Sequence, residues 1–423
     1  MKAFSRGDAA TVALTAALIA VAAVVGVAVG VEAATPPLYA LWRPHVGPGT
    51  LPAIAVAVLA VGWGPRWAAV LPWRRLLLSA YGVALAWTLS LTLVDGWHAT
   101  ATRLTTDAEY LSALPSTPDI PTMIGTYARR IVDFQPDSWN TQAAGHPPGA
   151  LLVFAVLDRI GLGGGVPAAL LCVVVGCVAA VAVPSALRSL GDEAAARAAV
   201  PFVVLFPGAV WVGVSADGLF LGVTAAAVAV LAAGLRRPWL AALSGVLFGF
   251  ACFLSYGLVL MGFLALAVAV AARRYVPLVW AALGAAAVAV CFAVAGFWWY
   301  DGYTAVRVRY YQGIAAHRPY WYWVWANLGA LAASAGPAGF AATRRALVAR
   351  RGPAALLCAA AVAAIVAADV SGLSKAEVER IWLPFAVWLP AAAVFLPRRS
   401  RPYWLAFQAV TALVVNHLFH TVW

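Results

Sequence analysis

Long apolar stretches separated by short polar segments recur along almost the whole chain. The stretches that we interpret as membrane spans are roughly residues 11–34, 51–65, 75–94, 166–187, 198–214, 217–234, 238–255, 257–272, 276–299, 323–342, 353–370, 381–397 and 402–422. A helix needs about 20 mostly apolar residues to cross a bilayer, and most of these stretches approach that length. The pattern therefore predicts an all-α fold, a polytopic transmembrane helical bundle of about 11–13 spans.

One long polar segment, residues 95–150, interrupts this pattern. The residues that follow it, 149–162, are apolar but form a short stretch with two charged side chains. We therefore predict that they form a helix lying in the membrane interface rather than crossing the membrane. No internal repeat or low-complexity linker is visible, so we predict one membrane domain over residues 1–423, with an extracytoplasmic loop and interfacial helices at 95–165.

The composition of the chain agrees with a lipid environment. Of its 423 residues, 64% are hydrophobic and 10% are charged, whereas soluble domains contain about 25% charged residues. The five cysteines all lie in apolar stretches, and none is spaced with His or Asp as in a metal site. The net charge of +12 arises mainly from Lys and Arg in short loops, so nucleic acid is not an expected partner.

Basic and acidic residues fall on opposite sides of the predicted bundle. With the N-terminus inside, most Lys and Arg residues occupy inner loops, as the positive-inside rule requires. All acidic residues except Asp8, Asp192 and Glu193 then lie outside or near the outer membrane face. The first apolar stretch, 11–34, is longer than the about 7–15 residues of a secretory signal peptide core, so we interpret it as an uncleaved span. We predict a multi-pass plasma-membrane protein with an extracytoplasmic active site.

Two carboxylates in the 95–150 segment are candidates for catalysis. Asp107 and Glu109 are two residues apart, so a regular helix would separate them by about 200°, whereas a loop or a helix start allows them to converge. In an inverting glycosyl transfer a carboxylate takes the proton from the acceptor hydroxyl. The alternative is that both are solvated loop acids or cap the next helix.

The polar residues 133–148 end with His146-Pro147-Pro148. Proline is favoured in the first turn of a helix, and a helix N-terminus offers unpaired N–H groups to an anion. His146 is therefore either a hydrogen-bond donor to a phosphate or an exposed loop histidine. Trp139, in the same segment, is a candidate for contact with a sugar or an acceptor.

A second outer segment, near residues 300–322, combines aromatic residues with three arginines. Aromatic residues are expected at a membrane interface, which explains most of them, but the arginines lie on the side that the positive-inside rule disfavours. Because arginine suits bidentate phosphate recognition, Arg307 and Arg309 are candidate phosphate ligands. The rings of Tyr310 and Tyr311 are candidates for stacking on a sugar.

Residues 374–385 carry four charges at the start of an apolar stretch, where a charge is costly unless it is paired or functional. Glu379 and Arg380 either form an ion pair at the membrane rim or bind a lipid-linked substrate. In the second case Arg380 would contact the phosphate, and Glu379 would hold Arg380 in place or contact a sugar. We favour the second.

Asp217, between two apolar stretches, is either a helix N-cap, which we favour, or a contact for sugar or acceptor.

Taken together, these segments resemble the GT-C superfamily of integral-membrane glycosyltransferases, which use polyprenyl-phosphate sugars on the outer membrane face. The resemblance spans roughly residues 95–397 and rests on the order and sidedness of Asp107-Ala-Glu109-Tyr110, His146-Pro147-Pro148-Gly149, the inner loop 188–197, the run from Phe206-Pro207 to Ser215-Ala216-Asp217-Gly218-Leu219-Phe220, and Glu379-Arg380-Ile381-Trp382-Leu383-Pro384-Phe385. In its richness in Ala and Arg the chain is also similar to actinobacterial cell-envelope glycosyltransferases. One difference is that the catalytic loop of the superfamily usually follows the first span, whereas here it follows the third.

The resemblance implies that Asp107 is the general base, with Glu109 as the second candidate, and that Arg380, with Arg307 or Arg309, holds the donor phosphate. The expected reaction transfers a sugar, with inversion, from a polyprenyl-phosphate donor to an envelope glycan or lipoglycan acceptor. We expect no cofactor besides this lipid-linked donor, and a role for a divalent metal ion stays open. The alternative is a lipid or small-molecule transporter or flippase. Transporters place charges near the bilayer midplane on broken helices, whereas here the charges map to loops and span ends.

Overall fold

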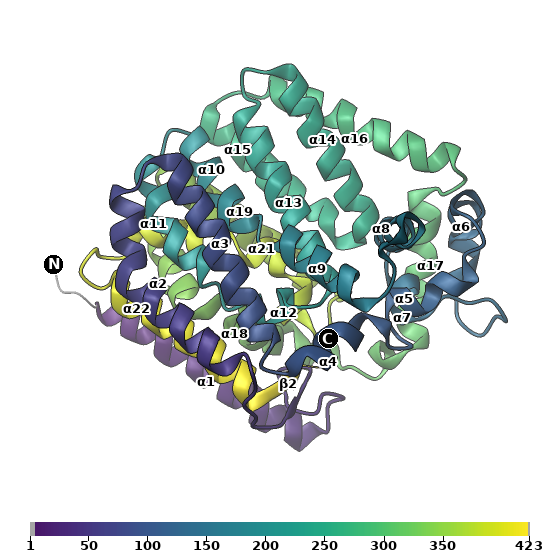
Figure 1. The fold of residues 1–423 in the computed structure, drawn as a ribbon, viewed down its shortest axis with the longest axis horizontal. Coiled ribbons are helices and arrows are strands. Elements are labelled where there is room, and N and C mark those ends of the chain that lie inside the picture. Colours follow the sequence, from purple (N-terminus) through teal and green to yellow (C-terminus); the bar gives the residue numbers. More distant parts are fainter. Residues whose placement is uncertain (1–4, 422–423) are drawn as a thin grey trace.

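The protein is described by a computed structural model over residues 5–421, and it is built almost entirely of helices (Figure 1). Within this range, seven helical segments are long and apolar enough to cross a membrane: α1 (Arg6–Val29), α2 (Thr50–Val70), α3 (Trp73–Thr92), the segment Gly165–Ser189 made of α9 (Gly165–Gly176) and α10 (Ala179–Ser189), α13 (Ala216–Ala233), α16 (Val276–Val294) and α19 (Gly352–Val370). Shorter apolar segments are α14 (Pro238–Leu254), η5 (Tyr256–Met261) with α15 (Gly262–Ala272), and Leu383–Phe395. The prediction of an all-α polytopic bundle is confirmed.

Two of the predicted spans are broken rather than continuous helices. The stretch 198–214 contains the end of α11 (Glu193–Val204) and the short α12 (Ala209–Val212), with Pro207 between them. The stretch 381–397 contains α21 (Leu383–Ala386) and η7 (Pro390–Phe395), each with a proline in its first turn. Proline lacks an N–H group and clashes with the preceding turn, which explains why neither stretch forms one helix.

The long helix α18 (Tyr320–Ala349) and the C-terminal helix α22 (Arg401–Leu418) complete the bundle. α18 packs on α1, α19 and α22. A short helix, α20 (Val378–Ile381), follows α19 and contacts α18, α12 and α21. This places the charged residues 374–380 against the inside of the bundle rather than at its rim.

The polar segment after α3 folds into a set of short helices. They are α4 (Gly96–Thr102), η1 (Arg103–Thr105), α5 (Tyr110–Ala113), η2 (Leu114–Ser116), α6 (Ile120–Thr126), η3 (Ala128–Arg130), α7 (Thr141–Gly145), α8 (Pro148–Leu157) and η4 (Asp158–Leu162). Figure 1 shows α5, α6, α7 and α8 gathered at one side of the molecule with α17 (Trp299–Gln312), which is followed by η6 (Ile314–Ala316). The segment expected to be helical at 149–162 is present as α8 and η4.

A two-stranded antiparallel sheet joins β1 (Ala40–Trp42) to β2 (Phe419–Thr421), with Leu41 opposite His420. The sequence pattern did not predict these strands. Each has only three residues, and their pairing depends on contacts between segments nearly 380 residues apart in the chain.

Helix α13 connects the two polar ends of the bundle. Asp217 lies in its first turn, and Arg236 follows its last turn. Its 18 residues, at about 1.5 Å per residue, span about 27 Å, close to the about 30 Å of a bilayer's hydrocarbon core. The carboxylate at one end is therefore separated from the arginines at the other by about the thickness of a membrane.

Candidate functional site

Segments far apart in the sequence meet beside the first turn of α13. Arg380, on α20, donates from Nη1 to Asp217 Oδ2 at 2.7 Å and from Nη2 to Glu377 Oε2 at 2.7 Å. Asp217 is 4% exposed and Arg380 is 7% exposed. Because both are removed from bulk water, their electrostatic interaction is stronger than that of a surface pair. Arg380 is thus held in a fixed position by two carboxylates.

Local structure explains how these carboxylates are presented. Ser215 is the N-cap of α13, and its hydroxyl accepts from the N–H of Asp217 at 3.1 Å. The interpretation of Asp217 as the cap is therefore wrong: the serine two residues earlier satisfies the helix end, which leaves the aspartate for Arg380. Ala376 and Glu377 adopt φ values of 70° and 63°. Such left-handed backbone costs about 1–3 kcal/mol for each non-glycine residue and is concentrated at functional sites.

A second arginine extends the network. Arg318 donates from Nη1 to Glu377 Oε1 at 3.0 Å and to the carbonyl of Lys375 at 2.8 Å. Its Nε and Nη2 are buried and have no hydrogen-bond partner among residues 5–421. A buried unsatisfied donor is costly, and a guanidinium edge of this kind is suited to an anionic oxygen. Burial opposes the ionisation of Glu377, but Arg380 and Arg318 hold the pKa of its carboxyl below its usual range.

Glu109 brings the polar segment 95–150 to this network. It is the residue before α5, is 5% exposed, and forms no ion pair in the described part of the chain. Its backbone carbonyl accepts from Asn140 Nδ2 at 2.6 Å and from Ser112 Oγ at 2.8 Å, which fixes the turn. Burial raises the pKa of Glu109 to about 7, although Arg380 is close enough to act in the opposite direction. A carboxylate with this pKa can exchange a proton near neutral pH.

Glu379 is a second buried carboxylate at the site. It is 1% exposed, and its Oε1 accepts from the backbone N–H of Tyr39 at 3.0 Å. Its Oε2 is buried and has no hydrogen-bond partner within the described residues. Burial raises the pKa of Glu379 to about 7. Glu109 and Glu379 therefore differ from the ion-paired Glu377, whose pKa is held low, in their readiness to carry a proton.

Aromatic rings pack against Tyr110, the residue after Glu109. Tyr110 is buried, and its ring centroid lies 5.8 Å from that of His146 and 5.5 Å from that of Phe154. His146 also packs on Phe220 at 5.5 Å, and its Nδ1 lies 2.9 Å from the carbonyl of Gln142. Burial lowers the pKa of His146. The histidine thus contacts the site through packing and is held as the neutral imidazole near neutral pH.

The remaining predicted site residues lie in different surroundings. Asp107 is exposed, two residues before Glu109. Trp139 is 2% exposed, its indole donates to the Tyr127 carbonyl, and the Arg130 guanidinium lies 3.4 Å from its ring centroid. It therefore belongs to the packed interior of the polar segment 95–150.

Helix α17 carries the other four predicted residues. Arg307 is exposed, and Arg309 is ion-paired with Asp133. Tyr310 accepts through its hydroxyl from the backbone N–H of Lys375 at 3.1 Å, and Tyr311 is 56% exposed. Of these four, Tyr310 is the residue with a hydrogen bond to the 374–380 segment among the described residues.

The sequence did not single out Tyr39, Arg318, Lys375 or Glu377 as site residues. Lys375 lies 5.6 Å and 5.2 Å from the rings of Tyr310 and Tyr311, and Arg318 lies 5.0 Å from the ring of Tyr39. The density of charges at 374–380 was a usable signal for Glu377 and Lys375. No local pattern indicates Tyr39, because it reaches the site from a segment 340 residues away in the chain. Arg318 is one of the three arginines of the 300–322 segment, but no local pattern indicates its contact with Lys375, which lies 57 residues further along the chain.

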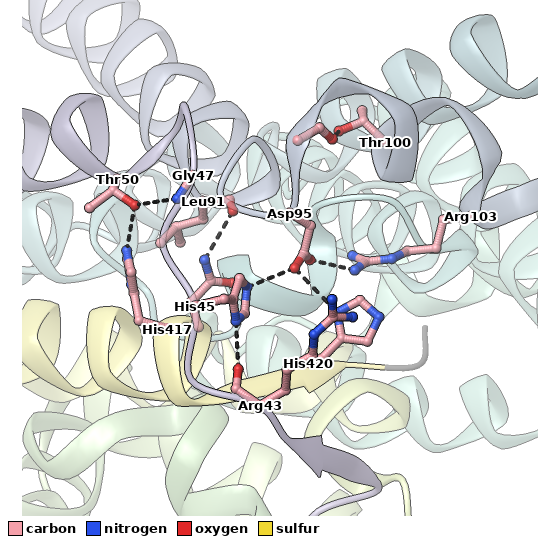
Figure 2. A network of polar contacts seen from close by, with 12 residues as sticks. Arg43, His45, Gly47, Thr50, Leu91, Asp95, Thr100, Arg103, His417 and His420 are labelled. Atoms are coloured by element: carbon pink, nitrogen blue, oxygen red, sulfur yellow. Dashed lines mark hydrogen bonds and ion pairs between the residues drawn. The ribbon is translucent and has the colours of Figure 1, made fainter.

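A separate polar network surrounds Asp95, at the end of α3 (Figure 2). Asp95 is ion-paired with Arg103, lies 2.8 Å from His45 Nε2, and lies 3.3 Å from His420 Nδ1. Burial opposes its ionisation, but Arg103 and His420 hold the pKa of Asp95 below its usual range. These contacts tie the start of the polar segment 95–150 to β2 and to the chain after β1, so they help to position the segment that carries Glu109.

Among the described residues, no group of three or more His, Cys, Asp or Glu side chains is placed to hold a metal ion. The site instead combines basic side chains with two carboxylates of pKa about 7. Such a set can bind an anion and accept a proton from a bound hydroxyl.

No protein-family model matches the chain, and a search of curated proteins finds no match. The described residues establish a helical membrane protein with seven candidate spans.

Proposed function

We propose that this protein is an integral-membrane glycosyltransferase that moves a sugar from a polyprenyl-phosphate donor to an envelope glycan or lipoglycan acceptor on the extracytoplasmic face. The observation that carries this proposal is the meeting of Glu109, from the polar outer segment, with the Asp217–Arg380–Glu377–Arg318 network. A proton acceptor and two arginines thereby share one site. The resemblance to the GT-C superfamily supports the same reaction.

In this reaction a carboxylate removes the proton from the acceptor hydroxyl. The hydroxyl oxygen then attacks the anomeric carbon, and the bond between that carbon and the phosphate oxygen breaks as polyprenyl phosphate leaves. The resemblance implies Asp107 as the base, whereas burial and a pKa of about 7 favour Glu109. We therefore assign the role to Glu109 and keep Asp107 as the alternative within the pair.

The leaving phosphate requires cations. Arg380 uses both terminal nitrogens on carboxylates, so its contribution is a fixed positive charge behind the site. Arg318 presents Nε and Nη2 without hydrogen-bond partners in the described range, and we assign it the direct contact to the phosphate. Preorganised donors of this kind stabilise developing negative charge without reorganisation.

The test uses the full-length protein purified in detergent and a panel of polyprenyl-phosphate sugars, with release of polyprenyl phosphate and transfer of labelled sugar as readouts. Glu109→Gln is expected to lower the rate by about 10²–10⁴-fold, the usual contribution of a general base. Asp137→Asn, at an acid of the same segment with a 55% exposed side chain, is the matched control and retains activity.

Asp107→Asn separates the two members of the pair. Loss of transfer in this variant with retention in Glu109→Gln would move the base role to Asp107. Retention in both would refute the role of the pair. Comparing envelope glycans of a deletion strain with its parent identifies the sugar and acceptor.

One observation favours transport as the second candidate function. The stretches 198–214 and 381–397 are broken helices that carry the network residues at or beside their ends, as occurs in transporters. Proteoliposomes separate the two: a flippase moves labelled lipid phosphate between leaflets without cleaving it, whereas the glycosyltransferase yields free polyprenyl phosphate.

A further inference from the structure

A pocket of about 580 Å³ lies at the end of the molecule opposite Asp217. The loop between α13 and α14 contributes Arg236 and Arg237, and the loop between α15 and α16 contributes Arg273 and Arg274. The volume falls within the roughly 300–1,000 Å³ of small-molecule sites. Four arginines from two loops thus line one concavity.

These four arginines form no ion pair among residues 5–421, in contrast to four other arginines at the same end. Arg344 and Arg345 are paired with Asp8, and Arg188 and Arg197 with Glu193. The chain has no acidic residue between Asp217 and Asp301. The positive charge of the pocket is therefore not neutralised by the protein around it.

The backbone adds to this charge. α14 begins after Arg237 and α16 begins after Tyr275, and neither helix start has a side-chain cap. Unpaired N–H groups and the positive end of the helix dipole favour an anion at such positions. One arginine is already fixed, because Arg274 Nη1 donates to the carbonyl of Leu235 at 3.1 Å and so joins the two loops.

The surroundings of the pocket indicate that the anion carries a lipid tail. Trp280 lines the pocket and is 41% exposed, and tryptophan is enriched at the level of lipid headgroups. From there an exposed apolar face continues along α16, with Val276, Val279 and Leu283 at 69%, 60% and 55% exposure. A free phosphate would make no favourable contact with this apolar face, whereas an acyl chain can lie along it.

We propose that this pocket binds the phosphate headgroup of an anionic phospholipid in the leaflet at the arginine-rich end of the bundle. Arg236, Arg237, Arg273 and Arg274 hold the phosphate, and Tyr275 and Trp280 flank the glycerol region. Basic pockets between membrane helices have the chemistry for this recognition. The site is independent of the proposed glycosyl transfer, from which α13 separates it by about 27 Å.

The test is native mass spectrometry of the full-length protein in neutral detergent, titrated with phosphatidylglycerol and, separately, with phosphatidylcholine of the same chains. The wild-type protein is expected to retain phosphatidylglycerol preferentially. The variant R236Q/R237Q/R273Q/R274Q is expected to bind phosphatidylglycerol roughly 100-fold more weakly, with unchanged binding of phosphatidylcholine.

The control variant R74Q/R75Q/R350Q/R351Q removes four exposed arginines at the starts of α3 and α19, outside the pocket. This control variant is expected to keep the wild-type preference for phosphatidylglycerol. If the fourfold pocket variant does not fold, R236Q/R237Q and R273Q/R274Q are measured separately, and each is expected to weaken binding.

Three results would overturn the proposal. They are unchanged phosphatidylglycerol binding in the pocket variants, an equal loss in the control variant, and displacement of phosphatidylglycerol by inorganic phosphate at equal concentration. The last result would identify a free anion as the ligand.

Discussion

Glu109 and Glu379 lie within the same buried cluster as Asp217 and Glu377, but neither forms an ion pair in the described part of the chain. A buried carboxylate without a cation partner is easier to protonate. This explains why two acids of the cluster have a pKa of about 7 while Arg380 and Arg318 keep that of Glu377 low. This difference between the acids suits a site in which some carboxylates bind arginines and another accepts a proton from the substrate.

The first residue-scale prediction concerns pH. If Glu109 is the base, it works only when deprotonated, so kcat/KM rises about tenfold per pH unit below about 7 and levels off above it. Initial rates of sugar transfer between pH 5 and 9 measure this profile. A rate that does not change between pH 5 and 9 would contradict Glu109 as the base.

The second residue-scale prediction concerns Arg380. Arg380→Gln leaves Asp217 and Glu377 buried without this cation, and breaking a buried pair in this way costs about 3–5 kcal/mol. The melting temperature of the purified protein is expected to fall accordingly. Arg307→Gln, at an exposed position of α17, is the control and changes stability by less than about 0.5 kcal/mol. Equal melting temperatures for both variants would contradict a structural role of the network.

At the scale of helices, close packing depends on small residues. A Cβ atom at Gly245 of α14 would lie 1.9 Å from the Ala281 carbonyl of α16, and one at Gly284 of α16 would lie 2.1 Å from the Ala242 carbonyl. Without a hydrophobic driving force in lipid, van der Waals contact between helices is a main source of their association. The two glycines therefore set the separation of α14 and α16, whose first turns shape the arginine-lined pocket.

The element-scale prediction follows from these contacts. Gly245→Ala and Gly284→Ala would push the backbones of α14 and α16 apart. Because overpacking of this kind is costly, each is expected to destabilise the protein by about 1–3 kcal/mol. Gly82→Ala in α3, where no atom lies within 4 Å of the added Cβ, is the control. It is expected to leave stability unchanged or raise it by up to about 1 kcal/mol through helix propensity. Thermal unfolding in detergent compares the three, and a similar response in all would contradict the packing argument.

For the whole molecule, the main feature is the opposition of two polar ends. One end carries the buried carboxylates and arginines of the candidate site. The other carries exposed arginines, and the four that line the pocket form no ion pair among residues 5–421. The positive-inside rule predicts that the arginine-rich end faces the cytoplasm, and the proposed reaction requires that orientation.

Labelling tests this orientation. In a cysteine-free variant, Phe134→Cys places a thiol at a residue of the outer segment that is 82% exposed, and Arg350→Cys places one at the exposed end of α18. A membrane-impermeant maleimide is expected to label the first in intact cells and the second only after permeabilisation. The reverse pattern would refute an extracytoplasmic site.

The sequence named four residues of the buried cluster, Glu109, Asp217, Glu379 and Arg380, but not their contacts. The residue types and membrane-edge positions were visible locally, because a charge beside an apolar stretch requires a partner or a function. Which carboxylate is buried was not visible: Asp107 and Glu109 are equivalent in the sequence, and only the turn held by Ser112 and Asn140 separates an exposed side chain from a buried one.

Hydrophobic patterning alone determined the class of this protein, because lipid requires that backbone polar groups be satisfied within helices and that side chains facing it be apolar. It also determined where charges gather along the chain. Only the tertiary structure decided that Tyr39 and Arg318 meet the 374–380 segment, that prolines divide two predicted spans, and that arginines of two loops line one pocket. These features arise from contacts between distant segments, and no local periodicity encodes them.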